Sequence, residues 1–380
     1  MTSLHICTSH SWGGLELYAA TLMIELQRAG TKVIALCARG SRIESTLKER
    51  GVDCRSFPGK NKLSPSSIFY FRRLLTDEQV ESVHVHFHRD IWIPSIAMRN
   101  DTSRKLFLSI YMGVNKKNDP FHRWIYGRVD AIFTSSEALN DRLPSLYPVP
   151  EQKIHFLPYG RNIESYRADP SRRRAIRASL GVAEDELLIG TMVRIDPGKG
   201  ALDFARSILY LDKRFAQRVR YAVFGEPTRK AHPVAGESPY EKNSEDYLAE
   251  LQELIRKESL EQRVLLPGFQ ADLIGTLSAL DIFVFPSRDE MYSLVILDAM
   301  CMGLPVVAAR AGGTVLQIRE GVSGLLYEVG NSADLASTLG RYLEDPELRK
   351  KHGSAARAFV IERHSMQHTI RELLRWYDTK

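Results

Sequence analysis

Short apolar segments alternate with amphipathic stretches along the chain. In the first part, strand-like segments cover residues 4–8, 33–38, 83–87, 106–110 and 131–134, and helical periodicity covers 15–29 and 41–50. In the second part, strands are predicted at 187–193, 219–225, 264–268, 281–287 and 305–310, and helices at 201–213, 245–257, 293–302 and 332–343. This alternation predicts parallel sheets with helices on both faces. We therefore expect an α/β fold with two doubly wound, Rossmann-like domains and a cleft between them.

The length of 380 residues also favours two domains. Proline, glycine and a run of charge place the boundary near residues 160–172, which predicts an N-terminal domain at 1–165 and a C-terminal domain at 166–363. The final helix, about 364–380, is expected to return to the first domain. Residues 226–246 have no apolar period and are expected to form a mobile surface loop.

Composition excludes several classes of protein. The chain is 44% hydrophobic and 26% charged, as in globular proteins, and its longest apolar runs fall far short of the roughly 18 residues that span a bilayer. No signal peptide is readable at the start, so we expect a cytoplasmic protein. The cysteines are expected to be buried thiols, because they lie too far apart for a zinc motif or a disulfide framework. They are Cys7, Cys37, Cys54 and Cys301.

The net charge of +6 lies entirely in the first part of the chain. Residues 1–160 hold 21 Lys and Arg against 15 Asp and Glu, whereas residues 161–380 hold 31 of each. A basic domain can attract nucleic acid, an anionic membrane or an acidic substrate, and charge alone does not choose among them.

Three segments carry candidate chemistry. Gly13 and Gly14 precede a predicted helix, where exposed amides favour phosphate, although a plain tight turn is an equal alternative. Arg194 and Lys199 follow a predicted strand and could hold a diphosphate, or simply be surface cations. In residues 286–318, Glu290 lies in a loop before a predicted helix.

The carboxylate of Asp298 follows eight residues after Glu290. An acidic group there could bind vicinal hydroxyls of a ribose, or could be an exposed helix residue.

Taken together, these motifs resemble retaining glycosyltransferases of family 4, which have the GT-B fold. The resemblance covers nearly the whole chain and rests on motifs in the family's order: the glycines at 13–14, VHVH at 83–86, LPYG at 157–160, R-x4-K at 194–199, FGE at 224–226, LPGF at 266–269, PSRDEMYSLVILDAMCMGLPVVA from 286 and GG at 312–313.

The resemblance implies a role for each matching residue. Glu290 would face the donor sugar near the transferring carbon, and Asp298, where the family has a second Glu, would bind the ribose. Tyr292 and Ser293 replace the usual Phe-Gly, and the amides of Ser293 and Leu294 would be open to the diphosphate. Further donor-binding residues would be Gly13, Gly14, Gly225, Gly268 and Phe269.

The segment HVHFHRD allows two interpretations of its histidines. If it stays extended, His84, His86 and His88 lie on one side, which could suggest a metal site. The family pattern instead implies that His86 lies in the active-site cleft near the donor sugar, with His84 packed.

The implied activity is transfer of a sugar, with retention, from a nucleotide-diphosphate sugar to a glycan or lipid-linked acceptor, in bacterial surface polysaccharide or lipopolysaccharide assembly. Arg194, Lys199 and helix amides would stabilise the leaving group, so no metal or other cofactor is expected. Two alternatives stay open: a GT-B sugar-nucleotide epimerase or phosphorylase, and a non-catalytic sugar-nucleotide-binding protein. No motif supports nucleic-acid binding.

In this fold the first domain usually binds the acceptor, so its cations could form an acceptor or membrane surface. The candidates lie in segments 60–75 and 116–128, which combine cations with aromatic residues: Arg72, Arg73, Lys116, Lys117 and Arg123. The alternative for the first segment is an ordinary helix that buries Ile68, Phe71, Leu74 and Leu75. The partners expected are therefore a nucleotide sugar, the acceptor and an anionic membrane surface, the last by peripheral contact.

Overall fold

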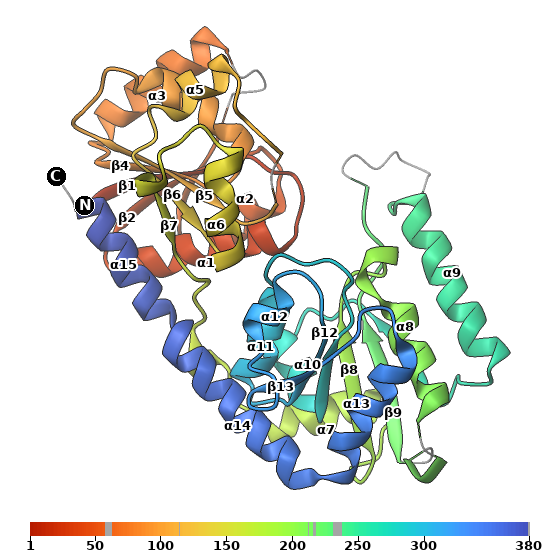
Figure 1. Ribbon diagram of the computed structural model, residues 1–380. Helices are drawn as coiled ribbons and strands as arrows, with labels where there is room; N and C mark the ends of the chain where they lie inside the picture. The colour runs from red at the N-terminus through yellow and green to blue at the C-terminus, as the bar shows by residue number, and fades with distance from the viewer. Residues whose placement is uncertain (58–62, 114, 212, 216–217, 231–237, 379–380) are drawn as a thin grey trace. The chain divides into compact units, whose positions relative to one another are not determined.

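The computed structural model describes residues 1–57, 63–113, 115–211, 213–215, 218–230 and 238–378. The chain forms two compact units. Unit 1 comprises Met1–Gly160 and Met366–Lys380, and unit 2 comprises Arg161–Ser365. Each unit is built on one parallel sheet, which confirms the predicted α/β class with two doubly wound domains (Figure 1).

Unit 1 contains a seven-stranded sheet in the order β3-β2-β1-β4-β5-β6-β7. Its strands are β1 (Thr2–Cys7), β2 (Lys32–Cys37), β3 (Asp53–Ser56), β4 (Ser82–Val85), β5 (Lys105–Ile110), β6 (Ala131–Thr134) and β7 (Ile154–Phe156). Its helices are α1 (Gly14–Arg28), α2 (Arg42–Glu49), α3 (Pro65–Asp77), α4 (Trp92–Ala97), α5 (Pro120–Tyr126), α6 (Glu137–Leu146) and α15 (Met366–Asp378). The last helix, blue in Figure 1, packs on α1.

Unit 2 contains a six-stranded sheet in the order β10-β9-β8-β11-β12-β13. Its strands are β8 (Leu187–Met192), β9 (Val219–Phe224), β10 (Val264–Gly268), β11 (Ile282–Phe285), β12 (Val306–Ala309) and β13 (Gly324–Tyr327). Its helices are α7 (Pro170–Ser179), α8 (Ala201–Ser207), α9 (Lys242–Lys257), α10 (Leu273–Ala279), α11 (Leu294–Cys301), α12 (Thr314–Gln317), α13 (Ser332–Glu344) and α14 (Pro346–Arg363).

The central strands are apolar and buried because helices cover both faces of each sheet.

Local differences from the prediction have simple causes. The edge strands β3 and β7 were not predicted because they are short and partly polar. Helix α8 ends at Ser207 and continues as a 3-10 turn, earlier than expected. The expected loop 226–246 is interrupted at Lys242, where α9 begins, and its residues 231–237 lie outside the described part of the chain.

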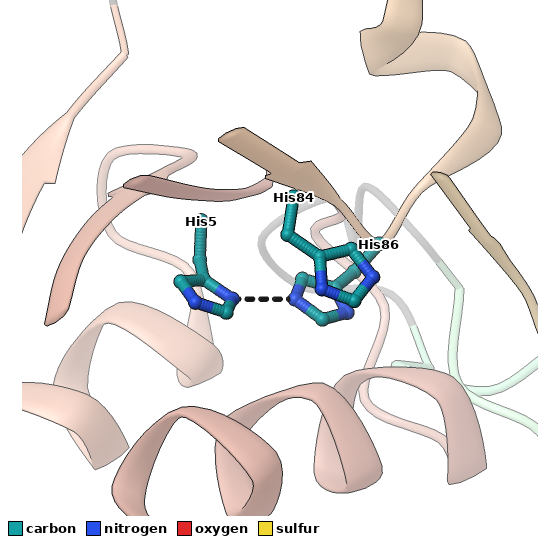
Figure 2. Close-up of side chains that lie close together, drawn as sticks. All are labelled: His5, His84 and His86. Carbon is teal, nitrogen blue, oxygen red and sulfur yellow. Dashed lines mark hydrogen bonds between the residues drawn. The ribbon is translucent and has the colours of Figure 1, made fainter. Parts of the chain in front are cut away.

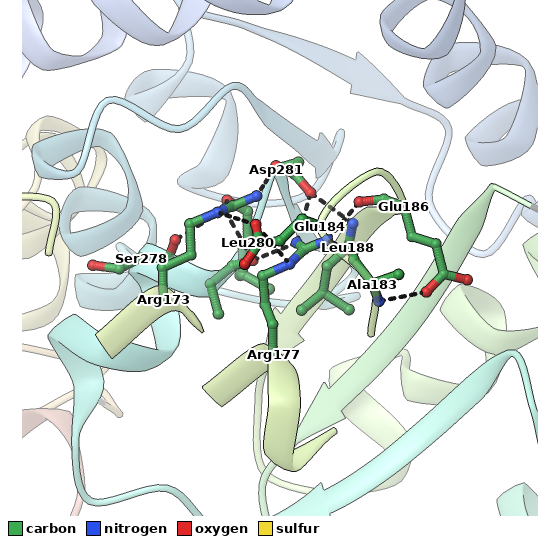
Figure 3. A network of polar contacts seen from close by, with 10 residues as sticks. Arg173, Arg177, Ala183, Glu184, Glu186, Leu188, Ser278, Leu280 and Asp281 are labelled. Atoms are coloured by element: carbon green, nitrogen blue, oxygen red, sulfur yellow. Dashed lines mark hydrogen bonds and ion pairs between the residues drawn. The ribbon is translucent and has the colours of Figure 1, made fainter. Parts of the chain in front are cut away.

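A buried arginine network fixes the amino ends of β8 and β11 in unit 2 (Figure 3). Arg177, on α7, is only 1% exposed, and it donates hydrogen bonds to the carbonyls of Ala183, Glu186 and Ala279. It also pairs with Asp281 at 3.1 Å, and Arg173 pairs with the same carboxylate at 2.8 Å. Asp281 in turn accepts the amide of Leu188 on β8. The charge is buried, but it is paired and multiply hydrogen bonded.

Replacing Arg177 with alanine should destabilise unit 2. The Arg177→Ala change leaves several buried carbonyls and part of the Asp281 charge without a partner, at a cost of about 3–5 kcal/mol. Hydrogen exchange of β8 peptides is the suitable measurement, because all four tryptophans, at 12, 92, 124 and 376, belong to unit 1. Arg172→Ala, on the same helix but half exposed, is the control and should change little. Equal protection of β8 in the two variants would contradict this assignment.

Candidate active site

The candidate site of unit 2 lies at the carboxyl edge of its sheet. Strands β8 and β11 are neighbours, but the chain continues from β8 toward β9 and from β11 toward β12, in opposite directions. Ligands in doubly wound sheets bind at such a switch point, because the two following loops diverge there. Arg194 and Lys199 lie in the loop after β8, and Glu290 lies in the loop after β11. The topology therefore brings together three residues predicted from sequence.

Lys199 and Glu290 form an ion pair across the switch point. Lys199 Nζ lies 2.9 Å from Glu290 Oε2, and each side chain is about one-fifth to one-quarter exposed. A second link between the loops is the hydrogen bond from the amide of Arg288 to the carbonyl of Gly198, at 2.9 Å. The pair places a cation and a carboxylate side by side at an open edge, where a ligand with negative and hydroxyl groups can meet both.

Glycines allow these loops to approach each other. Gly200 has φ +72°, and a Cβ built there would lie 2.0 Å from the carbonyl oxygen of Pro286. At Gly313 a Cβ would lie 1.6 Å from the carbonyl oxygen of Met291, and the Gly313 amide donates to the Glu290 carbonyl at 2.7 Å. Any side chain at these two positions would displace the loop that carries Glu290.

The neighbouring strands complete the edge. Gly225 follows β9, and its amide donates to the carbonyl of Gly268 at the end of β10, at 3.0 Å. Phe269 follows and is 54% exposed. Arg194 is exposed, and its guanidinium has no hydrogen bond or ion pair with any described residue. The edge thus offers a free cation, an exposed ring and closely packed backbone.

The start of α11 differs from the expectation. The Ser293 amide is not open to a diphosphate, because it donates to Gln317 Oε1 at 2.8 Å, and Gln317 Nε2 donates back to the Ser293 carbonyl at 2.7 Å. The sequence does not indicate this contact, since Gln317 lies 24 residues from Ser293. Tyr292 is buried, and its hydroxyl lies 2.8 Å from His364 Nε2. The Leu294 carbonyl accepts a bond from Arg161 at 3.3 Å.

Asp298 lies on α11 and is only 5% exposed. Its Oδ1 is 2.5 Å from Nε of Arg161 and accepts a 2.6 Å hydrogen bond from the Tyr166 hydroxyl. Burial, and the neighbouring carboxylate second, raise the pKa of Tyr166, so the hydroxyl keeps its proton and donates. The expected contact of Asp298 with a ribose stays a prediction, but its two protein partners are an observation that the sequence did not suggest.

Unit 1 has an analogous switch point between β1 and β4. Gly13 caps α1, and its amide donates to Glu16 Oε2 at 2.9 Å, whereas Gly14 is the first helical residue. The loop after β1 is tied to the segment after β4, because Asp90 accepts bonds from the amide and hydroxyl of Thr8 at 2.7 and 2.5 Å. Burial raises the pKa of Asp90 to about 6. Neither Thr8 nor Asp90 was predicted from sequence.

His86 is fully buried in unit 1, within a cluster of three imidazoles (Figure 2). His5 Nδ1 lies 2.9 Å from His86 Nε2, and His86 Nδ1 lies 2.7 Å from the Tyr111 hydroxyl. His84 contacts the hydroxyls of Ser109 and Tyr377. The segment does not stay extended as far as His88, because β4 ends at Val85 and a 3-10 turn begins at His88.

The imidazole cluster is built as a neutral network. Ligand atoms of His5, His84 and His86 lie within 4.8 Å of one another, as a metal site would require. All six ring nitrogens, however, already have protein partners, the remaining one being the Ser3 hydroxyl at 3.1 Å from His5. No carboxylate joins the cluster among the described residues. Burying a divalent charge there would be costly, so hydrogen bonding is the favoured interpretation. A role of His86 near the donor sugar stays a prediction.

The predicted basic surface of unit 1 lies on α3, on α5 and in the loop before α5. Exposed aromatic side chains accompany the cations: Phe69 is 70% exposed, Phe121 47% and Trp124 41%. Arg73 is paired with Asp77 at 3.1 Å. The four other predicted cations have no carboxylate partner in the described part of the chain, although two of them donate to neutral acceptors: Arg72, Lys116, Lys117 and Arg123. The buried face of α3 contains Phe71, Leu74 and Leu75, as the alternative also required, with Ile68 half-buried.

Two parallel-sheet units, each with a switch-point edge, define a protein with the GT-B architecture. Two family models match consecutive parts of the chain: Glycosyltransferase Family 4 at residues 12–165 and Glycosyl transferases group 1 at residues 172–359. The chain therefore belongs to this family of glycosyltransferases, as its motifs indicated.

Individual relatives are more distant. The D-inositol 3-phosphate glycosyltransferase of Saccharomonospora viridis is 29% identical over 258 residues, which cover 67% of this chain and 56% of that enzyme. The chain thus spans little more than half the length of that relative. HepE of Anabaena, in complex with UDP, has a TM-score of 0.81 at 22% identity and 99% coverage of both chains. A glycosyltransferase of Rickettsia africae has a TM-score of 0.85 at 19% identity, covering 99% of this chain and 97% of that one. These structures confirm the predicted fold.

Some residues of the site gave weak signals in the sequence. One is Gly200, directly after Lys199. Another is Arg288, whose guanidinium donates two hydrogen bonds of 2.9 Å to the carboxylate of Asp203. Their importance depends on the loops after β8 and β11 lying side by side in the fold, which the sequence does not indicate. Regarding membranes, no helix among the described residues combines the length and apolarity that a bilayer crossing demands.

The imidazole cluster predicts a loss of stability in acid. Burial lowers the pKa of His5 to about 3 and the pKa values of His84 and His86 well below 6.5. The unfolded chain therefore binds more protons, and the free energy of unfolding falls as pH falls from about 6.5 toward 3. Each imidazole contributes up to about 1.4 kcal/mol per pH unit. In His5→Asn, the slope between pH 6 and 4 should fall by about one proton, measured by urea unfolding with tryptophan fluorescence.

A matched control separates the charge effect from simple destabilisation. Ile6→Val weakens the same strand without removing a titrating group, so it should leave the pH slope unchanged. The raised pKa of Asp90 acts in the opposite direction, because its protonation below pH 6 favours the folded state. That contribution is common to all three proteins and cancels. Identical slopes for His5→Asn and the parent protein would contradict a neutral buried imidazole.

Proposed function

We propose that this protein transfers a sugar from a nucleotide-diphosphate sugar to a glycan or lipid-linked acceptor. The observation that carries the proposal is the Lys199–Glu290 pair, 2.9 Å apart, at the switch point of unit 2. A diphosphate needs cations and a sugar needs carboxylate acceptors for its hydroxyls, and this edge supplies both. The names of the relatives agree with this class, since the Saccharomonospora protein is called a glycosyltransferase and the Anabaena structure contains UDP.

The chemistry we propose is retaining and independent of metal. The bond between the anomeric carbon and the diphosphate oxygen breaks, and the acceptor oxygen forms its bond to that carbon on the same face. The proton of the acceptor hydroxyl passes to the leaving phosphate oxygen. Lys199 and Arg194 stabilise the charge that develops on the diphosphate, while Glu290 orients the sugar through its hydroxyls. The nucleotide base of the donor would lie against Gly225, Gly268 and Phe269.

Removing the Lys199 ammonium should therefore slow turnover. Lys199→Ala is expected to lower the rate of nucleoside diphosphate release at saturating donor by about 10²–10³-fold, as for other groups that stabilise developing negative charge. Lys257→Ala, at the exposed end of α9, is the matched control and should keep the parental rate. Chelation with EDTA should leave the parental rate unchanged.

The same assay decides between classes of function. Sugar nucleotides that contain UDP, GDP or ADP are first ranked by how far each raises the melting temperature of the protein. Tight donor binding without turnover, even with acceptor extracts, would identify a non-catalytic binding protein. Parental turnover in Lys199→Ala would refute the electrostatic role. An altered sugar nucleotide with no transfer would identify an epimerase.

We propose that unit 1 meets the acceptor at a surface that contacts anionic membranes in the cytoplasm. The reaction we propose belongs to the assembly of a surface polysaccharide or lipopolysaccharide. Cations that have no carboxylate partner among the described residues, and exposed aromatic rings, lie on α3, on α5 and in the loop before α5. Basic side chains are attracted to anionic headgroups, and Trp and Phe favour the interface.

Charge reversal tests this surface directly. Lys116→Glu/Lys117→Glu should abolish most sedimentation with vesicles of phosphatidylglycerol, since each lysine near the surface contributes about 1 kcal/mol. Lys350→Glu/Lys351→Glu makes the same change of net charge on an exposed part of unit 2 and serves as the control. Equal binding by the two variants would show that net charge, not this surface, governs the contact.

A further inference from the structure

Arg288 joins the two loops of the unit 2 switch point through its backbone and through its side chain. Its amide donates to the carbonyl of Gly198 at 2.9 Å, next to Lys199. Its Nε and Nη2 atoms donate to the two carboxylate oxygens of Asp203, each at 2.9 Å. Asp203 lies in the first turn of α8, which begins two residues after Lys199. One residue of the loop after β11 therefore holds the chain on both sides of Lys199.

The two ion pairs that join these loops differ in their exposure to water. The carboxylate of Asp203 is shielded, since its side chain is 3% exposed, against 51% for Arg288. The side chains of Lys199 and Glu290 are 21% and 24% exposed. A bidentate contact of a guanidinium with a buried carboxylate is stronger and more directional than a single contact between two partly hydrated side chains. The Arg288–Asp203 contact therefore fixes the distance between the loops, and the Lys199–Glu290 pair follows from it.

Both ends of this contact are anchored. Asp203 belongs to α8, where the neighbouring amide of Leu202 donates to the hydroxyl of Tyr247 on α9 at 3.1 Å. At the other end, Glu290 follows only two residues after Arg288. A displacement of Arg288 would therefore move Glu290 relative to α8 and to the lysine that precedes this helix.

We propose that Arg288 is a positioning residue, which through Asp203 and the Gly198 carbonyl holds Lys199 and Glu290 in the relative positions that the reaction requires. This inference rests on the proposed function. Arg288 sets the geometry in which the ammonium meets the diphosphate while the carboxylate meets the sugar. A displacement of about 1 Å in such a site can slow turnover about 10²-fold. We expect the effect on turnover to exceed the effect on donor affinity, because the other donor contacts stay in place.

The first test measures turnover and donor affinity separately. Arg288→Ala should lower the rate of nucleoside diphosphate release at saturating donor about 10–10²-fold, while the KM of the donor changes less than about threefold. Arg288→Lys keeps the charge but loses the planar fork, so its rate should lie between those of the parent and of Arg288→Ala. The control is Arg220→Ala, which removes an arginine at the amino end of β9, where it pairs with Glu186 at 2.6 Å. This control should keep the parental rate, and melting temperatures report the stability of every variant.

A double-mutant cycle shows whether Arg288 acts through Lys199. In Lys199→Ala the ion pair is already broken, so adding Arg288→Ala should cost at least several-fold less in rate than it costs the parent. Asp203→Asn preserves the size of the side chain and weakens the contact from its other end. It should also slow turnover several-fold, which keeps the test decisive where Arg288→Ala does not fold.

Each outcome supports or refutes the inference. An equal loss of rate in Arg288→Ala and Arg220→Ala would mean a role in stability alone and would overturn it. Losses that multiply in full in the Lys199→Ala/Arg288→Ala variant would also overturn it, because Arg288 would then act independently of the ion pair. Both results leave the proposed function intact. Absence of turnover by the parent with every sugar nucleotide tested would instead refute the proposed function, and this inference with it.

Discussion

The candidate site depends on the meeting of two loops at the switch point of unit 2. The ion pair between Lys199 and Glu290 contributes little to stability, because both side chains are partly exposed to water. Its importance is geometric. The loops can bring the two charges within 2.9 Å only because Gly200 and Gly313 let backbone pack against backbone. In the proposed function, a diphosphate that competes for the ammonium of Lys199 would release the carboxylate of Glu290 at the same time.

The two units apply one topology to different chemistry. In unit 2 the loops at the switch point present charged groups to an open edge. In unit 1 the corresponding loops are tied by Asp90 and Thr8, and the strands beneath them carry a buried network of neutral imidazoles and hydroxyls. A neutral network with every nitrogen paired gives rigidity and little reactivity. The two units thus differ at their switch points because different residues follow the corresponding strands.

The sequence was sufficient for the parts that depend on local pattern. Buried parallel strands are apolar runs in the sequence, and its motifs include both Lys199 and Glu290, which the fold pairs. It was insufficient where a partner lies far away in the chain. His5 lies 81 residues from His86, Gln317 lies 24 residues from Ser293, and Arg161 lies more than 130 residues from Asp298. Edge strands such as β3 were not predicted for another reason. Water forms half of the environment of an edge strand, so its sequence does not need an apolar run.

Ion pairs neutralise part of the charge of unit 1: Glu44 with Lys48, Glu78 with Lys32 and Asp101 with Arg104 are examples. Lys116 and Lys117, side by side in the loop before α5, are among the cations without a carboxylate partner in the described residues. A field produced by a few neighbouring groups is local and is screened within about 8–10 Å at physiological salt. Such a field acts on a partner only in direct contact, which fits a surface for docking better than long-range attraction.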